Sequence, residues 1–172
     1  MKLLEQIRHP NIILLLGIII EQPNTIGIVM EYMENQSLSL VLSNSKIALD
    51  EKQKIETALQ VAQAMYYLHT CNPPIIHRDL KSSNCLVDEY FRIKLCDFGI
   101  SKIRRDQQNY STKTVGTYQY MAPETISKSI YTTKTDVYSF GILLWEIWTR
   151  KVVYESMQPI QIIYSVVDEV IY

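Results

Sequence analysis

The sequence predicts an α+β fold with a small sheet region followed by a larger helical region. Two apolar segments, Ile12–Ile20 and Thr25–Glu31, flank a turn and are rich in isoleucine, which is typical of strands. A long amphipathic pattern over Asp50–His69 then indicates a helix. Val137–Trp148 is almost continuously apolar, so we expect a helix buried on all sides.

The first predicted elements are a helix end and a strand, with a break between them. Met1–Arg8 places apolar residues on one face and is interpreted as the end of a helix, which His9-Pro10-Asn11 interrupts. The run Ile12–Ile20 is far shorter than the roughly 20 residues of a membrane helix, and it lies too far into the chain for a secretion signal. We expect a buried strand there and no membrane contact.

The main helix has a readable beginning and end. Asp50 is a good N-cap, and Gln53 completes the pattern of a capping box. Asn72-Pro73-Pro74 ends the element, and a short helix is predicted earlier, over Ser39–Leu42. The predicted apolar stripe consists of Ile55, Ala58, Leu59, Ala62, Met65 and Leu68.

The second half alternates short apolar stretches with polar turns. Cys85–Val87 and Ile93–Leu95 are strand-like, and Arg104–Thr114 is polar without periodicity, which favours a loop. Gln158–Val167 is the last predicted helix.

The composition fits a globular protein, with 47% hydrophobic and 20% charged residues. A net charge of −1 gives no indication of binding to nucleic acid. Cys71, Cys85 and Cys96 form no CxxC pair and are odd in number, which favours a reducing, cytoplasmic location. The oligomeric state stays open.

Three polar residues stand beside short apolar stretches: Asp79, Asn84 and Asp97. Their hard oxygen atoms suit Mg²⁺, which takes a few protein oxygens together with waters and phosphates. Taken singly, each could equally be an ordinary turn residue.

The order of motifs separates these alternatives. His77-Arg78-Asp79-Leu80-Lys81-Ser82-Ser83-Asn84 is followed by Asp97-Phe98-Gly99 and then by Ala122-Pro123-Glu124. Over essentially the whole chain, the sequence resembles the eukaryotic protein kinase family. The segments Arg8–Ile12 and Asp136–Gly141 resemble that family as well.

The resemblance implies roles for individual residues, with ATP and Mg²⁺ as cofactors. Asp79 would accept the proton of the substrate hydroxyl or orient it, and Lys81 would hold the γ-phosphate. Asn84 and Asp97 would bind Mg²⁺. Asp136 would anchor the backbone of the catalytic loop.

The adenine site and the lobe contacts are implied in the same way. Backbone groups of Glu31 and Met33 would bind adenine, with Met30 guarding the pocket behind it and Leu86 packing under the ring. His77 and Phe98, with Leu4 and Leu15, resemble the hydrophobic column that links the two lobes.

The acceptor side resembles serine/threonine kinases, and within them the tyrosine-kinase-like subgroup. Lys81, together with Thr117, would shape the site for a Ser or Thr of a protein substrate, and Glu124 belongs to the docking segment. Thr112 and Thr114 are the expected regulatory phosphosites. Cys96 is read as a small buried side chain rather than a reactive thiol.

The resemblance also implies a partial domain. Residues 1–33 would be a remnant of the N-lobe and hinge, namely the end of helix C plus two or three strands. Residues 34–172 would be a mostly α-helical C-lobe, truncated after a helix at about 158–168. The sequence contains no Gly-rich loop and no strand Lys for ATP. The alternatives are therefore a segment of an active kinase in intracellular signalling, or a catalytically impaired kinase-like scaffold.

Overall fold

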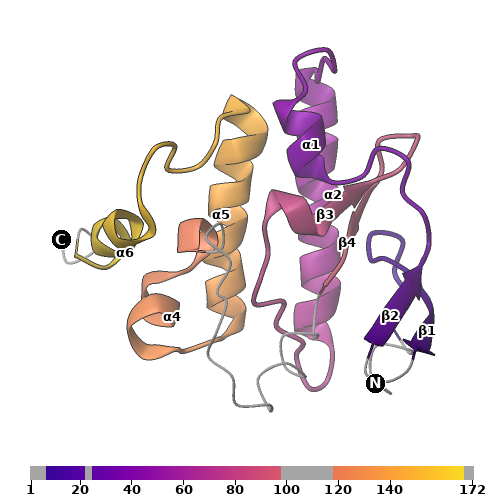
Figure 1. Ribbon diagram of the computed structural model, residues 1–172, viewed down its shortest axis with the longest axis horizontal. Coiled ribbons are helices and arrows are strands. Elements are labelled where there is room, and N and C mark those ends of the chain that lie inside the picture. The colour runs from indigo at the N-terminus through magenta and orange to yellow at the C-terminus, as the bar shows by residue number, and fades with distance from the viewer. Residues whose placement is uncertain (1–6, 22–24, 98–117, 169–172) are drawn as a thin grey trace.

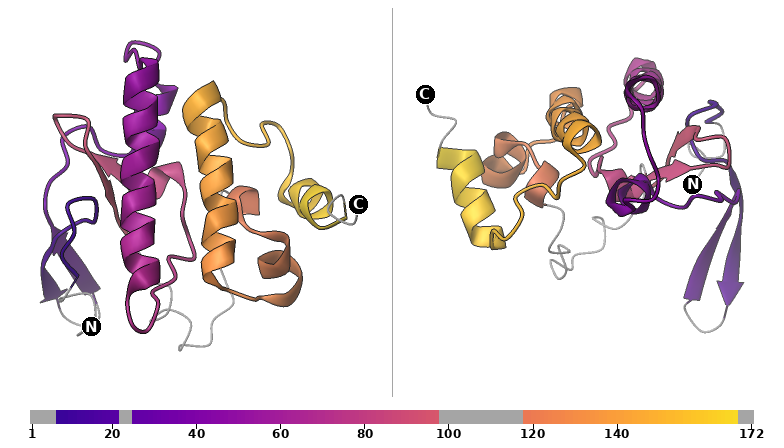
Figure 2. Two further views of the ribbon diagram at one scale, coloured as in Figure 1. Left: turned by 180° about the vertical axis from the view of Figure 1, so that it is seen from behind. Right: turned by 90° about the horizontal axis from the view of Figure 1, so that it is seen from above.

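The computed structural model describes residues 7–21, 25–97 and 118–168. A two-stranded hairpin lies at one side of the molecule, and the helices α1, α2, α4, α5 and α6 make up most of the remainder (Figures 1 and 2). The long helices α2 and α5 run side by side in all views, with α4 and α6 on the far side of α5. This arrangement confirms the α+β class with a small sheet region.

The hairpin consists of β1 (Leu15–Glu21) and β2 (Thr25–Met30), which pair antiparallel. The predicted strand over Ile12–Ile20 begins later than expected, because Ile12 instead bridges to Leu95. The prediction that this strand is buried is wrong, since Ile20 is 78% exposed. The hairpin has two strands in the described residues, so part of its apolar surface is left uncovered.

A second small sheet lies deep in the molecule. β3 (Cys85–Val87) and β4 (Ile93–Leu95) pair antiparallel, as the short apolar stretches predicted. Asn11 joins this sheet to α2, because its side-chain amide donates to the carbonyl of Ile93 and to Gln60 Oε1. These contacts fix the strand that leads into Asp97.

Helix α1 covers Leu38–Ser43 and α2 covers Glu51–Thr70. The capping box at the start of α2 is confirmed, with Asp50 and Gln53 each accepting from the other's backbone N–H at 2.7 and 3.0 Å. The predicted stripe is partly wrong: Met65 and Leu68 are buried, but Ile55 and Leu59 are more than half exposed. The buried face comprises Thr57, Val61, Ala64, Met65 and Leu68.

Helices α4 (Pro123–Lys128), α5 (Thr133–Thr149) and α6 (Pro159–Asp168) complete the fold. Burial of α5 on all sides is a wrong prediction, since Trp145 and Trp148 are 44% and 47% exposed. They line a shallow apolar groove between α2 and α5. Polar residues make up much of the buried face of α5, where they hydrogen-bond to neighbouring segments.

Buried residues from α1, α2, α5, the second sheet and the loop after α2 form one core, which includes Leu38, Val61, Leu68, Leu80, Leu95, Leu143 and Ile147. Among the described helices, none has both the length and the apolar character that a membrane crossing requires. The helix end expected at Met1–Arg8, the loop at 104–114, and Leu4 and Phe98 fall wholly or mainly outside the described residues.

Candidate functional site

The loop that carries Asp79 is fixed to helix α5 through its backbone. The N–H groups of His77 and Arg78 each donate to the carboxylate of Asp136 at 2.9 Å. Arg78 has a φ of 70°, a left-handed conformation that costs free energy unless its surroundings hold it. Asp136 is 1% exposed, so these bonds lie in the protein interior. The expected anchoring role of Asp136 is confirmed.

His69 completes the group around this carboxylate. Its Nε2 lies 2.8 Å from Asp136 Oδ2, which links α2 to α5 at the same point. His9 Nδ1 accepts from the backbone N–H of Asn11, so both histidines make structural contacts.

Asp79, Lys81 and Asn84 come together in one cluster. Lys81 Nζ lies 2.9 Å from Asp79 Oδ2, and the Asn84 amide donates to Asp79 Oδ2 at 2.9 Å and to the Asp79 carbonyl at 2.7 Å. A short 3-10 helix, η2 (Ser82–Asn84), places Asn84 back beside Asp79. The Asp79 side chain keeps 31% exposure, so one face of its carboxylate reaches solvent.

Asp97 enters from the end of β4. The backbone N–H of Cys96 donates to the carbonyl of Asn84 at 3.0 Å, which brings the two segments against each other. Asp97 is exposed and has a φ of 60°. Burial raises the pKa of the Cys96 thiol to about 12, helped by the charges of Asp97 and Asp79. A protonated, buried thiol fits the prediction of a small packing residue.

The donor atoms of this cluster suit Mg²⁺. Both amide hydrogens of Asn84 are directed to Asp79, which makes its amide oxygen the atom available as a ligand. Asp97 supplies a carboxylate. Within the described residues, no three His, Cys, Asp or Glu side chains gather as a metal cage. Mg²⁺ needs no such cage, since it usually binds one or two protein oxygens plus phosphates and waters.

The segment after β2 is held by Glu31. Its Oε1 accepts from the backbone N–H of Leu14 at 2.7 Å, and its Oε2 accepts from Lys94 Nζ at 2.6 Å. The side chain is therefore engaged within the protein. Among the described residues, no backbone hydrogen bond uses the carbonyl of Glu31 or the N–H of Met33. These are the kinds of group that adenine binding requires.

Leu86 lies in β3, close to the same segment. Its neighbour Val87 exchanges backbone hydrogen bonds with Gln36 and Asn35, at 2.8 and 3.0 Å. Met33 is buried, whereas Leu86 is half-buried. The connector is thus tied to the strand that carries Leu86, the residue predicted to pack under adenine.

The predicted docking segment is described in part. Tyr120, Met121 and Ala122 are buried against α5, and Glu124 lies in the first turn of α4. No ion pair within the described residues involves Glu124. Thr112, Thr114 and Thr117 lie outside the described residues.

One group near the site was missed at the sequence level. Glu146 of α5 accepts hydrogen bonds from Ser82 and Tyr120 in the interior. The signal was available, because a lone Glu within the apolar run Val137–Trp148 must be either exposed or partnered. Which of the two applies depends on tertiary contacts.

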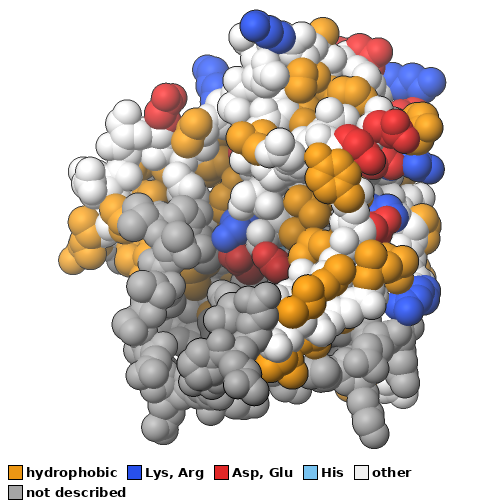
Figure 3. Space-filling model, turned by 45° about the vertical axis from the view of Figure 1, so that its right-hand side comes forward, with side chains coloured by type: hydrophobic (Ala, Val, Ile, Leu, Met, Phe, Trp, Pro, Cys, Tyr) orange, Lys and Arg blue, Asp and Glu red, His pale blue; other side chains and the backbone are white. Residues whose placement is uncertain are grey.

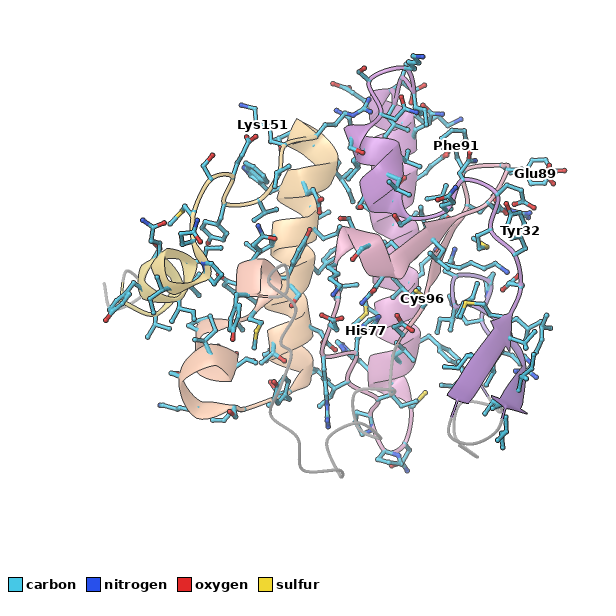
Figure 4. All side chains as sticks on the ribbon, viewed as in Figure 1. Tyr32, His77, Glu89, Phe91, Cys96 and Lys151 are labelled. Carbon is cyan, nitrogen blue, oxygen red and sulfur yellow. The ribbon has the colours of Figure 1, made fainter. Side chains whose placement is uncertain are left out.

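Charges on the surface are mixed. Basic and acidic side chains are interspersed on the face in Figure 3, in keeping with the net charge of −1. In Figure 4, His77 and Cys96 lie near the centre of the view, while Glu89 and Tyr32 lie at its edge. The absence of nucleic-acid binding stays a prediction from net charge.

The chain matches known proteins over nearly all its length. The family model described as protein tyrosine and serine/threonine kinase matches residues 1–170. The probable serine/threonine-protein kinase drkC of Dictyostelium discoideum is 46% identical over 168 residues, covering 95% of this chain and 22% of that protein. Serine/threonine-protein kinase CTR1 of Arabidopsis thaliana is 41% identical, covering 95% of this chain.

The probable serine/threonine-protein kinase SIS8 of Arabidopsis thaliana is 40% identical over 165 residues. The chain spans 16% of SIS8, 20% of CTR1 and 22% of drkC, so it corresponds to about a fifth of these relatives. The family match and the identities agree with the motifs and with the geometry of the cluster. The chain belongs to the protein tyrosine and serine/threonine kinase family.

Proposed function

We propose that this chain carries the catalytic loop of a protein serine/threonine kinase, which transfers the γ-phosphoryl group of ATP to a protein hydroxyl. The observation that supports this most directly is the cluster of Asp79, Lys81 and Asn84, with contacts of 2.7–2.9 Å. The names of the relatives support a Ser or Thr acceptor, as does Lys81 within the catalytic loop.

Asp79 is the group that meets the substrate hydroxyl. It accepts the proton of that hydroxyl or orients it for in-line attack. Asn84 holds the Asp79 side chain through one hydrogen bond, and Lys81 holds it through an ion pair. Lys81 is 18% exposed and ends beside Asp79, which supports a contact with a phosphate oxygen near the attacking hydroxyl.

Asn84 and Asp97 are the residues that would hold Mg²⁺. With the ion bound there, these residues would supply a positive charge that offsets the charge on the phosphates. The backbone groups of Glu31 and Met33 would receive adenine, and Leu86 would pack under its ring. Thr117 and Glu124 belong to the proposed docking of the peptide substrate, and Thr112 and Thr114 to its regulation.

The test is phosphorylation of Ser/Thr peptides by the full gene product, with labelled ATP and Mg²⁺. Asp79→Asn keeps the shape of the side chain but removes its basicity, so turnover should fall by about 10²- to 10⁴-fold. Glu89→Gln removes a charge in the same way from an exposed side chain remote from the cluster, and should leave turnover unchanged. Equal turnover of the wild type and Asp79→Asn would contradict the proposal.

A further inference from the structure

The connector between β2 and α1 is tied to the turn between β3 and β4 by hydrogen bonds. The backbone N–H of Asn35 donates to the carbonyl of Val87 at 3.0 Å, and the N–H of Val87 donates to the carbonyl of Gln36 at 2.8 Å. The side-chain amide of Asn35 donates to the carbonyl of Asp88 at 2.7 Å. Among these three bonds, only the last depends on the identity of a connector side chain.

A second connector side chain reaches the same turn. Glu34 Oε2 accepts from the backbone N–H of Glu89 at 3.1 Å, but this bond is exposed, whereas the bond of the Asn35 side chain is partly buried. Water replaces an exposed hydrogen bond at little cost. In Figure 4, Tyr32 of the connector and Glu89 and Phe91 of the turn lie along the same edge of the view. Asn35 therefore makes the stronger side-chain contact between the two segments.

The turn that receives the Asn35 amide is held by its own hydrogen bonds. Asp88 is 7% exposed, and its Oδ1 accepts from the backbone N–H groups of Tyr90 and Arg92, both at 2.9 Å. Its Oδ2 accepts from Arg92 Nε at 2.7 Å. Burial alone would raise the pKa of Asp88, but the hydrogen bonds from Arg92 and Tyr90 hold that pKa below its usual value. A charged Asp88 with these contacts fixes the carbonyl to which Asn35 donates.

The connector also contains a strained residue. Gln36 has a φ of 57°, in the left-handed region that glycine adopts freely and other residues adopt at a cost. Its N–H donates to the carbonyl of Met33 at 3.0 Å, which closes a turn over residues 33–36. Such a conformation persists only where the surroundings hold it. The hydrogen bonds of Asn35 and Gln36 to the β3–β4 turn supply that support.

The strained turn joins the two parts of the proposed adenine site. Met33, whose backbone N–H is one of the proposed adenine-binding groups, is the first residue of the turn. Ser37, directly after the turn, forms a β-bridge with Leu86. A change in the conformation of the turn would therefore move Met33 relative to Leu86. The Asn35 contact thus bears on the spacing of groups that it does not itself touch.

We propose that Asn35 is a positioning residue for nucleotide binding, whose side-chain amide holds the connector on the β3–β4 turn and so fixes Met33 relative to Leu86. This role rests on the proposed kinase activity and on the adenine site proposed with it. Asn35 acts through the connector, since its amide is bound to the carbonyl of Asp88. Its effect is therefore specific to the nucleotide and absent from the peptide side of the reaction.

The test alters the Asn35 amide in the full gene product and measures nucleotide binding by calorimetry. Asn35→Ala should weaken the binding of ATP with Mg²⁺ about fivefold, the value of one partly buried hydrogen bond. Asn35→Asp keeps the shape but places an oxygen against the carbonyl of Asp88, so it should weaken binding at least as much. KM for ATP should rise in parallel, while kcat and KM for the peptide should stay within about twofold.

Two further measurements separate positioning from a general loss of structure. GTP presents other hydrogen-bonding groups in place of those of adenine, so its binding should change less than about twofold, and the preference for ATP should narrow. Hydrogen exchange in the absence of nucleotide should be about fivefold faster at the amides of Asn35 and Val87 in Asn35→Ala, because the hydrogen bonds of these amides open more often.

A double-mutant cycle tests the link to the strained turn. In a Gln36→Gly background the left-handed conformation carries no strain, so Asn35→Ala should weaken ATP binding only about twofold. Asn44→Ala is the matched control: it removes an exposed side-chain hydrogen bond, to the N–H of Lys46 at the end of α1, and should leave all constants unchanged.

The outcomes separate this inference from the proposed function. A wild type that neither binds ATP nor phosphorylates a peptide contradicts the kinase activity itself. A wild type that binds ATP, with the same affinity in Asn35→Ala and Asn35→Asp, overturns the positioning role. Equal weakening of ATP and GTP, or a loss of active enzyme that tracks lower thermal stability with both KM values unchanged, also overturns it, since a structural role alone predicts those patterns. An equal loss with and without Gln36→Gly does so as well.

Discussion

Arg150 links the end of α5 to α1, and its replacement should destabilise the fold measurably. The guanidinium donates to four backbone carbonyls at 2.7–3.1 Å, those of Val41, Leu42, Asn44 and Ile47. The bond to Asn44 is exposed, so water can replace it, whereas the other three are partly buried. At about 1 kcal/mol for each of these three, Arg150→Ala should lower the free energy of unfolding by about 3 kcal/mol.

Two further variants divide this loss into parts. Arg150 has a φ of 55°, which glycine adopts without strain, so Arg150→Gly should lose about 1 kcal/mol less than Arg150→Ala. Arg150→Lys keeps a charge that reaches about one carbonyl, and should lose about 2 kcal/mol. Comparison of alanine with glycine therefore isolates the backbone contribution.

Urea unfolding of the chain measures these differences. Both tryptophans of the sequence, Trp145 and Trp148, lie on α5, so their fluorescence reports on the helix that Arg150 caps. The midpoint should shift without a change in slope. Lys151→Ala, at an exposed neighbour, should cost less than about 0.5 kcal/mol. If Arg150→Ala lies within about 0.5 kcal/mol of the wild type, the reasoning from these hydrogen bonds is wrong.

Three other outcomes are expected. Asp136→Asn replaces one of the two accepting oxygens with an NH2 group, which then faces the backbone N–H of either His77 or Arg78, so unfolding in urea should show a loss of about 3 kcal/mol, and peptide phosphorylation should fall more than about tenfold. Burial lowers the pKa of His77 below 6.5, so the free energy of unfolding is highest above that pH and falls below it, where the unfolded chain takes up a proton. Urea titrations from about pH 7 to about pH 5 should show this fall in the wild type and a flatter profile in His77→Gln. The Cys96 thiol, with a pKa of about 12, should resist iodoacetamide while the less buried Cys71 reacts first, as peptide mass mapping would reveal; preferential labelling of Cys96 would contradict the burial argument.

Features set by neighbouring residues could be predicted from the sequence. The capping box of Asp50 and Gln53 needs only a spacing of three, and the structure contains it. The strands Cys85–Val87 and Ile93–Leu95 were equally local predictions. The cluster of Asp79, Lys81 and Asn84 was implied by a motif within one loop, so its assembly required little long-range information.

The orientation of helices could not be predicted with the same success. Periodicity identified α2, but Ile55 and Leu59 face outward, while Thr57 is buried. A helix with apolar residues on several sides offers more than one face to a core, and its neighbours decide which is used. Similarly, the importance of Glu146 depends on hydroxyls far away in the sequence, Ser82 and Tyr120, which no local pattern connects to it.

The attachment of the catalytic loop to Asp136 has a consequence for mutational tolerance. Its donors at His77 and Arg78 are backbone N–H groups, which every amino acid except proline possesses. The attachment therefore survives changes of side chain at both positions, and it fails only where proline removes the donor or where the acceptor changes. These hydrogen bonds therefore require a particular side chain at position 136 but not at positions 77 and 78. With respect to this attachment, substitutions should be tolerated less well at position 136 than at the two positions that it holds.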